Sequence, residues 1–524
     1  MHISISPLLL NYMEMNYREL TPLERVHEFG HRAAIDFNQE ENYFSGHIEV
    51  ASYLVTKEKM YIWDTVWGDE AIGDQKGDEL LIELANHDAL KRLSAVEQLT
   101  LTKRYITNRN TSSFSRWEHI WGSIIPVRRL ARKYNISEED SLKLQLRTLL
   151  SDIGHSTGSH LGDWTFQGFG GSEDLHDLEL LSYLEKTGIN DILRKHNIKP
   201  EDVIFPKIED WIECPQPFLC IDRLDYALRE MKRWLPMSYN LEHFFNKDNL
   251  DNLEIVDNQL VITNKDLAKE FAELYLELNH EHWNDKVHKL QLALYIARAK
   301  RVIADDHGSD ESWLDYHPRD VLYCSDPEFE LAMREHDPFG YALDTIMTNI
   351  ASYERNIGWH MRQERIRMRR ANSKYGQLLN FEDDAGLYNG YLKHHPMLSF
   401  SKSNEETSRD VRGFEFDLPA LKTRYIDPLV KNGNSVQRLS DVDPYFQVTL
   451  GSFRLKMAES YIAKIAIADK GFDEELHEQL RQTNLKWQES MSRPRMSETL
   501  LKEHITNAAR LAILYSFVNI HYES

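Results

Sequence analysis

The spacing of apolar residues predicts a short β element near the start of the chain and helices through most of the remainder. Met60 to Trp63 and Thr65 to Trp67 are rich in aromatic and β-branched residues, and Gly68 and Gly73 mark turns beside them, which is typical of strands. Beyond residue 80, apolar side chains recur every three or four positions, as in amphipathic helices. The same spacing predicts helices over three further segments, Ile124 to Tyr134, Ser141 to Leu150 and Glu498 to Tyr515.

The segment Leu149 to Asp163, LLSDIGHSTGSHLGD, places clustered polar residues directly after an apolar run. This order is typical of a buried helix that ends by delivering polar side chains into a cleft. Asp152 and His155 are three residues apart, so on a helix they share a face, which suits a metal ligand beside a proton-transfer group. The alternative is a capped helix end whose histidines, His155 and His160, lie on the surface.

Composition narrows the class of protein. The chain has 524 residues, of which 41% are hydrophobic and 28% charged, which is ordinary for a globular protein of two or three domains. The net charge of −22 argues against a general binder of nucleic acid or anionic membranes. The three cysteines follow no zinc or disulfide spacing, and we find no long apolar run. We therefore expect a cytoplasmic protein that does not enter a membrane.

A second histidine pattern lies near the start of the chain. The residues HEFGH, His27 to His31, fit the H-E-x-x-H pattern in which two histidines bind Zn²⁺ and the glutamate, here Glu28, acts as general base. With 23 histidines in the chain, a chance match is not rare, and no clear third ligand is present nearby. A zinc peptidase is therefore an alternative hypothesis, against a polar helix in an N-terminal extension.

Two further segments complete an ordered pattern around Asp152. Upstream lies SRWEHIWG, which contains Arg116 and His119, and downstream lies CIDRLDYALRE, which contains Asp222 and Tyr226. Together the segments resemble the HD-domain phosphohydrolases, and among them the deoxynucleoside triphosphate triphosphohydrolases of the dGTPase-like branch. The resemblance also includes residues 64–72, 87–99, 279–287 and 320–327, and so spans about residues 60 to 335.

The resemblance implies a mainly all-α fold, with an HD-domain helical core and a small N-terminal β element. It predicts an N-terminal extension over residues 1–55, an HD phosphohydrolase domain over 56–335 and a helical C-terminal region over 336–524. A helical core is also what brings together ligands that come from separate parts of the chain.

The metal ligands implied by the resemblance are His119, Asp152 and Asp222, and the set departs from the family at one position. Ser151 stands where the family has the histidine of its His-Asp doublet. A set with one imidazole and two carboxylates favours Mg²⁺ or Mn²⁺. Either Ser151 holds a water molecule in the vacated place or the metal site is inactive.

The resemblance also assigns roles around the metal. It implies that His155 and His176 take part in proton transfer to the leaving group, and that His160 is structural or contacts phosphate. Histidine suits proton transfer because its pKa lies close to the working pH. The implied triphosphate contacts are Arg116, Arg223 and Lys286, the implied sugar contacts are Tyr226 and Glu230, and Trp283 is the implied aromatic gate.

We therefore expect metal-dependent hydrolysis of a deoxynucleoside triphosphate, or of a ribonucleoside triphosphate, to nucleoside and tripolyphosphate. The alternative is a catalytically silent HD-fold protein that binds a nucleotide as a regulator. Relatives commonly form homo-oligomers, and we expect one here. The basic run from Arg362 to Arg370 is either a solvated helix face or a site for an allosteric nucleotide or single-stranded nucleic acid.

Overall fold

A computed structural model describes the parts of the chain that surround the predicted site. The described residues are 52–55, 59–99, 114–167, 175–178, 180–204, 211–234, 250–286, 288–293, 295–296, 299, 326, 329, 398–402, 413–418, 421–459 and 461–466.

The N-terminal β element predicted from the sequence is present as a three-stranded antiparallel sheet in the order β1-β2-β3. Residues of β2 are alternately buried and exposed, so one face of the strand packs on the helices that come after it. Short helices then lead toward the centre of the molecule. The bounds are β1 (Ser52–Val55), β2 (Met60–Asp64), β3 (Gly68–Ile72), α3 (Asp78–Ala85), α4 (Asp88–Lys91) and the 3-10 helix η1 (Arg92–Ala95).

Three helices form the centre of the fold: α6 (Arg116–Lys133), α7 (Glu138–Leu150) and α13 (Ile221–Trp234). Ser115 caps α6 by accepting a hydrogen bond from the backbone of Glu118, and Ser137 caps α7 in the same way. Almost every residue in the first three turns of α6 is buried, which is typical of a helix enclosed on all sides. The helix that carries Arg116 and His119 therefore lies in the interior.

The close packing of α6 against α13 depends on a glycine. A Cβ atom at Gly122 would lie 1.6 Å from Nη2 of Arg229 on α13, so no larger residue fits without displacing that guanidinium. The remaining helices before α13 are shorter: α8 (His160–Gln167), α9 (Leu175–Leu178), α10 (Leu180–Thr187), α11 (Ile189–Lys195) and α12 (Pro200–Ile204).

The second half of the described chain adds two sheets. Strand β5 pairs with β4 and, in parallel, with β8, giving the order β4-β5-β8-β9, and a further sheet has the order β6-β10-β7. Pairing of β5 with β8 crosses the domain boundary predicted at residue 335. The bounds are β4 (Leu253–Val256), β5 (Gln259–Ile262), α14 (Lys265–Leu278), the π-helical turn η3 (Asn279–Trp283), β6 (Leu398–Lys402), β7 (Gly413–Asp417), β8 (Leu429–Asn432), β9 (Ser435–Arg438), α20 (Leu439–Val442), α21 (Pro444–Met457) and β10 (Tyr461–Ala466).

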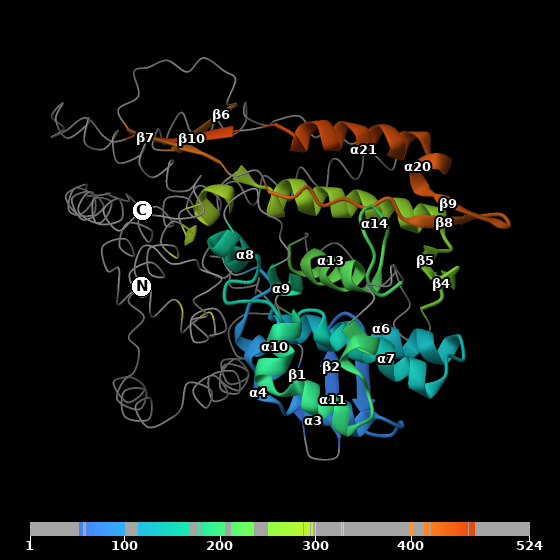
Figure 1. The fold of residues 1–524 in the computed structure, drawn as a ribbon. Helices are drawn as coiled ribbons and strands as arrows, with labels where there is room; N and C mark the ends of the chain where they lie inside the picture. The colour runs from blue at the N-terminus through green and yellow to red at the C-terminus, as the bar shows by residue number, and fades with distance from the viewer. Residues whose placement is uncertain are drawn as a thin grey trace, which may run out of the picture.

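The helices lie in layers (Figure 1). α14 runs between α21 on one side and α13 on the other, and α6 and α7 lie beneath α13. One continuous hydrophobic core joins these layers, from Met60 and Trp67 near the first sheet to Phe446 and Phe453 of α21. The fold is mainly α-helical, as predicted, but the strands in the C-terminal part were not expected from the sequence.

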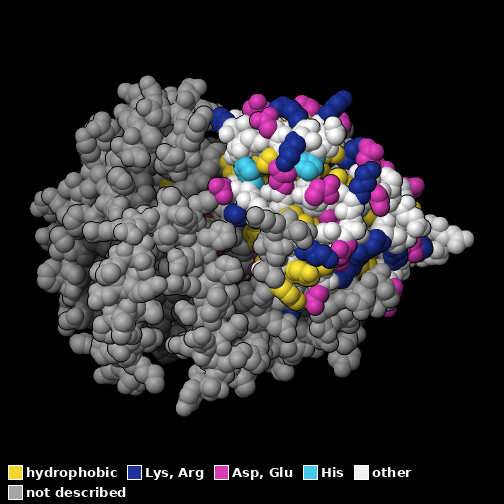
Figure 2. All heavy atoms as spheres, turned by 90° about the horizontal axis from the view of Figure 1, so that it is seen from below, with side chains coloured by type: hydrophobic (Ala, Val, Ile, Leu, Met, Phe, Trp, Pro, Cys, Tyr) yellow, Lys and Arg dark blue, Asp and Glu magenta, His cyan; other side chains and the backbone are white. Residues whose placement is uncertain are grey.

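One face of the described surface carries charged side chains of both signs. On the face in Figure 2, basic and acidic side chains are interspersed over the described part of the molecule. Among the described helices, none is both long and apolar enough to cross a membrane.

Candidate functional site

His119 on α6 lies between two carboxylates of α13. Its Nδ1 is 2.6 Å from Oδ2 of Asp225, and its Nε2 is 3.0 Å from Oδ1 of Asp222. Asp152, located just after α7, places Oδ2 3.7 Å from the same Nε2. The carboxylates of Asp152 and Asp222 therefore both approach Nε2 of His119, and the three residues proposed as metal ligands lie together.

Asp225, which holds the far side of the His119 ring, belongs to a fully buried ionic network. Nε of Arg229 lies 2.9 Å from Oδ2 of Asp225. Its Nη2 lies 2.6 Å from Oδ2 of Asp64, and its Nη1 lies 3.0 Å from Oε1 of Glu118. The indole of Trp67 donates a hydrogen bond of 2.6 Å to Asp225. A buried charge is tolerated only when it is paired and hydrogen-bonded, and here the network keeps the Asp225 carboxylate ionised and in place.

The carboxylates around His119 favour positive charge at this position. Burial opposes a charged ring, but hydrogen bonds to Asp222 and Asp225, together with the charges of Asp225 and Asp152, raise the pKa of His119 to about 10. The side chain of His119 is only 3% exposed, whereas that of Asp222 is 36% exposed. The cluster is thus closed on the α6 side and open at Asp222.

Asp152 is shared between this cluster and two other groups. Arg116 donates to its Oδ2 at 2.7 Å, and Nε2 of His155 lies 3.3 Å from its Oδ1. Burial opposes ionisation of Asp152, but the Arg116 guanidinium and the neighbouring histidine hold its pKa well below the usual range. Arg116 also donates to the hydroxyl of Ser159. Arg116, predicted to contact triphosphate, therefore pairs with Asp152, a proposed metal ligand.

Ser151 and Asp152 lie beyond the end of α7, because this helix stops at Leu150. The prediction that Asp152 and His155 share a helix face was wrong. They approach each other in a turn in which the His155 backbone donates to the Asp152 carbonyl over 3.1 Å. The Ser151 hydroxyl donates back to the carbonyl of Thr148 in the last turn of α7.

Three histidines and one aspartate form a second cluster next to Asp152. The rings of His155 and His176 stack with centroids 3.7 Å apart, and the ring of His160 lies 5.0 Å from that of His155. Asp163 accepts a hydrogen bond of 3.0 Å from Nδ1 of His160 and lies 3.6 Å from Nδ1 of His176. His155 and His176, the predicted proton-transfer residues, are therefore neighbours, and Asp163 lies between His176 and His160.

The environments of the stacked histidines shift their pKa values in opposite directions. Burial, together with the charge of Arg116, lowers the pKa of His155 well below its usual value. Burial also disfavours a charge on His176, but the nearby carboxylate of Asp163, 3.6 Å from its Nδ1, raises the pKa of His176. Neighbouring groups whose pKa values are driven apart are suited to acid and base roles.

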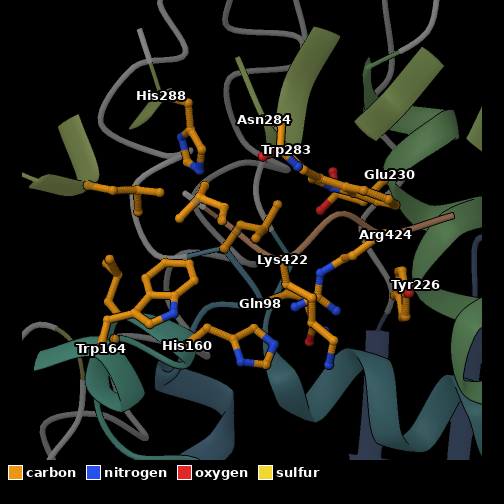
Figure 3. A pocket seen from close by; sticks show the side chains of 15 residues that line it. Gln98, His160, Trp164, Tyr226, Glu230, Trp283, Asn284, His288, Lys422 and Arg424 are labelled. Carbon is orange, nitrogen blue, oxygen red and sulfur yellow. The ribbon is translucent and has the colours of Figure 1, made fainter. Parts of the chain in front are cut away.

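A pocket that is partly open to solvent adjoins the histidine cluster, with about 700 Å³ of space between its lining residues when the solvent-open part is included. His160 faces it from α8, Tyr226 and Glu230 from α13, and Trp283 from η3. Lys422 and Arg424, which precede β8, line the same pocket, and Arg424 lies beside Tyr226 and Glu230 (Figure 3). The pocket thus combines aromatic rings, two cations and one face of the histidine cluster.

The other predicted substrate contacts are placed differently. Arg223 donates to the carbonyl of Phe218 at 2.6 Å and does not line this pocket, and neither does Lys286. Tyr226 shares a short hydrogen bond of 2.5 Å with Tyr275. Nε2 of His282 lies 3.3 Å from Glu230. Of the predicted substrate contacts on α13, Tyr226 and Glu230 therefore line the pocket.

Several predicted features lie outside the described residues. They are the H-E-x-x-H pattern of His27 to His31, the basic run Arg362 to Arg370 and the final helix from Glu498 to Tyr515. The predicted roles of these segments stay predictions, as do the domain boundaries.

The first cluster, formed by His119, Asp152 and Asp222, fits a divalent metal ion. It offers one imidazole nitrogen and two carboxylates, and the Nδ1 of His119 donates to Asp225, which is the arrangement that orients metal-binding histidines. His119, Asp152 and Asp222 would hold the ion, and Asp222 would face the solvent side.

Sequence reasoning assigned no role to three residues that the structure brings to the site. Asp163 could have been noticed because it lies three residues after His160 near the start of α8, a spacing that favours contact on a helix. Lys422 and Arg424 belong to a stretch without any recognisable pattern, and only the fold brings them to the pocket.

Comparison with known proteins agrees with the chemistry of the site. No protein-family model matches the chain. The chain is 28% identical over 290 residues to "Metal-dependent phosphohydrolase cns2" of Cordyceps militaris, a match that covers 54% of this chain and 75% of that protein. It is 27% identical over 218 residues to the uncharacterized protein YdhJ of Bacillus subtilis, covering 41% of this chain and 60% of that protein.

Solved structures resemble the chain more distantly. A phosphohydrolase from Bacteroides thetaiotaomicron aligns with a TM-score of 0.45 and 16% identity over 78% of this chain and 100% of that one. A hypothetical protein from Aquifex aeolicus aligns with a TM-score of 0.46 and 14% identity over 84% of this chain and 100% of that one. The sequence relative is named as a metal-dependent phosphohydrolase, and among the described residues the cluster of His155, His160, Asp163 and His176 has the donors to hold a metal ion.

Proposed function

We propose that the protein hydrolyses nucleoside triphosphates, deoxynucleoside triphosphates foremost, to nucleoside and tripolyphosphate. The observation that carries this proposal is the position of Asp152. One of its oxygens lies 3.7 Å from Nε2 of His119 and the other 3.3 Å from Nε2 of His155. A single carboxylate therefore links a metal-binding set to a set of proton-transfer residues.

The first cluster supplies the place for the metal ion. When bound by His119, Asp152 and Asp222, a divalent cation supplies Lewis-acid polarisation of a phosphoryl oxygen. Asp225 and Arg229 keep the imidazole of His119 oriented, and Arg116 fixes Asp152 from the other side. The substrate phosphates reach this set from the side on which Asp222 is exposed.

The second cluster supplies a proton to the leaving group. Attack of water at the α-phosphorus expels the 5′ oxygen of the nucleoside, which has to be protonated as the bond to phosphorus breaks. His176 holds a proton because Asp163 raises its pKa, and His160, which shares that carboxylate, faces the pocket. His155 is kept neutral by burial and by Arg116, so it does not place a second positive charge against the ring of His176.

The pocket suits a nucleotide. A triphosphate carries about four negative charges, and charged groups recognise it through charge-assisted hydrogen bonds. Lys422 and Arg424 supply positive charge among the residues that line the pocket (Figure 3). Trp283 and Tyr226, with rings 5.8 Å apart, offer aromatic surface for the sugar or base, and Glu230 offers a hydrogen-bond acceptor beside them.

One observation favours the alternative of a catalytically silent nucleotide-binding regulator. The Arg116 guanidinium pairs with Asp152 at 2.7 Å, and Ser151 replaces an expected imidazole ligand. An arginine that neutralises a metal ligand competes with the metal for it. The regulator would bind nucleotides in the same pocket without cleaving them.

A product assay tests the proposal. Purified protein is incubated with each of the four deoxynucleoside and four ribonucleoside triphosphates and Mg²⁺ or Mn²⁺, and products are separated by anion exchange. We expect nucleoside and tripolyphosphate from the wild type, none from Asp222→Asn, and unchanged products from Asp266→Asn, an exposed control carboxylate on α14. Nucleoside monophosphate or stepwise phosphate release would overturn attack at the α-phosphorus. Nucleotide binding without products, with hydrolysis appearing only in Ser151→His, would establish the regulator instead.

A further inference from the structure

The second cluster has the composition of a metal site in its own right. His155, His160, Asp163 and His176 each offer one ligand atom, and these four atoms lie within 4.8 Å of one another. The residues come from α8, α9 and the turn before α8. Four convergent donors of this kind are more than proton transfer to a leaving group requires.

The donor types differ from those of the first cluster. The second cluster offers three imidazole nitrogens and one carboxylate oxygen, whereas His119, Asp152 and Asp222 offer one nitrogen and two carboxylates. Nitrogen-rich sets favour Zn²⁺ and similar transition metals, and carboxylate-rich sets favour Mg²⁺ or Mn²⁺. The two clusters therefore select different ions.

Three buried atoms in the second cluster lack a hydrogen-bond partner among the described residues. They are Nδ1 of His155, Oδ1 of Asp163 and Nδ1 of His176. Buried polar atoms are nearly always satisfied in folded proteins, so such atoms call for a bound ion or water. His155 already donates through Nε2 to Asp152, which leaves the lone pair on Nδ1 to a metal, as in carboxylate–histidine–metal arrangements.

The backbone is shaped to bring these residues together. A Cβ atom at Gly154 would lie 2.4 Å from the carbonyl oxygen of His176, so only glycine lets the turn that carries His155 pack this closely against α9. The side chains of His160 and His176 are 19% and 13% exposed, and His160 lines the pocket. An ion can thus reach the cluster through the pocket.

We propose that His155, His160, Asp163 and His176 form a tetrahedral site for Zn²⁺, separate from the site of the hydrolytic metal. Neighbouring ligand atoms around tetrahedral zinc lie about 3.4 Å apart, given bonds of about 2.0–2.2 Å. Binding of the ion draws the four donor atoms together from their observed spread of up to 4.8 Å. Bound zinc occupies the nitrogens that would otherwise carry the proton for the leaving group, so it inhibits hydrolysis. This consequence, unlike the binding itself, rests on the proposed function.

The test uses Co²⁺ as a spectroscopic substitute for zinc, in full-length protein freed of metal and without substrate. Tetrahedral Co²⁺ absorbs strongly in the visible range, whereas octahedral Co²⁺ absorbs weakly. We expect the strong absorption in the wild type, its displacement by Zn²⁺, and its persistence in Asp222→Asn. In His160→Ala, and in His176→Gln as a second variant, we expect at least a 10-fold loss of Co²⁺ affinity, with circular dichroism verifying that both variants fold.

Two results would overturn the zinc site. Strong absorption that disappears in Asp222→Asn would place the ion in the first cluster, and absorption that survives in both histidine variants would place it elsewhere, as at His27 and His31. An activity measurement with Zn²⁺ added to saturating Mn²⁺ then tests inhibition separately. Because Co²⁺ binding is measured without substrate, failure of the proposed hydrolysis would leave the binding result intact.

Discussion

Nδ1 of His119 lies 2.6 Å from Oδ2 of Asp225, and this contact directs the opposite nitrogen toward Asp222 and Asp152. Asp225 is itself held by Arg229 and Trp67. The orientation of the imidazole is thus set by residues that no ligand reaches, because Asp225 and Arg229 are fully buried.

Replacing Asp225 by asparagine should weaken metal binding although Asp225 is not a proposed ligand. Loss of such a supporting carboxylate costs about 10-fold to 100-fold in metal affinity. Electron paramagnetic resonance of free Mn²⁺ gives the dissociation constant directly. An Asp225→Asn affinity equal to that of Asp266→Asn would show that His119 is not the ligand we assign.

Gly122→Ala should destabilise the protein, because the added Cβ would lie 1.6 Å from Nη2 of Arg229. Overpacking in a tight interior costs about 1–3 kcal/mol. The matched control is Gly451→Ala in the middle of α21, where nothing lies within 4 Å of the added atom. There the substitution should stabilise by about 0.4–1 kcal/mol. Urea unfolding of both variants measures the difference, and similar midpoints for the two would contradict the close packing of α6 on α13.

The buried pair of Asp78 and Arg128 should make stability depend on pH. Their side-chain atoms lie 2.7 Å apart. Burial opposes the Asp78 charge, but the hydrogen bond and charge of Arg128 outweigh burial and lower the pKa of Asp78. A carboxyl with a lowered pKa stabilises the fold above its unfolded pKa of about 3.9, and this contribution is lost as the pH falls through the folded value.

Asp78→Asn should therefore cost about 3–5 kcal/mol at neutral pH, as expected when one partner of a buried ion pair is removed. The difference from the wild type should shrink below about pH 4. Asp74→Asn is the control, because Asp74 is 67% exposed in its pair with Lys59 and should change stability by less than about 1 kcal/mol. A cost for Asp78→Asn that is the same at acidic and neutral pH would contradict the assigned pKa shift.

Lys422 and Arg424 should govern substrate binding. Each charged hydrogen bond to a phosphate contributes about 1.5–3 kcal/mol, so Arg424→Ala and Lys422→Ala should each raise KM by roughly 10-fold to 100-fold. Lys269→Ala removes a cation of α14 that pairs with Asp443 and should leave KM unchanged. Steady-state kinetics of the three variants makes the comparison. Unchanged KM in both pocket variants would exclude these cations from substrate binding.

The sequence was informative where a pattern is local. Tyr226 and Glu230 lie four residues apart, and because both belong to α13 they reach the same pocket. The order of His119, Asp152 and Asp222 was readable because each lies in a distinctive short segment. The strands β8 and β9 were not expected, since four-residue runs carry too little periodicity to be told from loops.

Side-chain direction was beyond sequence reasoning. Arg116 and Arg223 were both expected to contact phosphate, yet Arg116 pairs with buried Asp152 and Arg223 with the carbonyl of Phe218. An arginine pairs with whichever acceptors the fold places around it, and these come from other segments. For the same reason the sequence does not indicate Lys422 and Arg424, because it is the fold that places the chain segment before β8 beside the pocket.

The central claim is that hydrolysis depends on a divalent metal held by His119, Asp152 and Asp222. The most direct test is the rate of triphosphate hydrolysis as a function of free Mn²⁺ for wild type, Asp222→Asn and Asp266→Asn after removal of metal by a chelator. We predict no hydrolysis without metal, full recovery with Mn²⁺, and at least a 10-fold higher Mn²⁺ requirement, or no recovery, in Asp222→Asn alone. Hydrolysis that persists in the chelator, or an Asp222→Asn curve that coincides with that of Asp266→Asn, would contradict the claim.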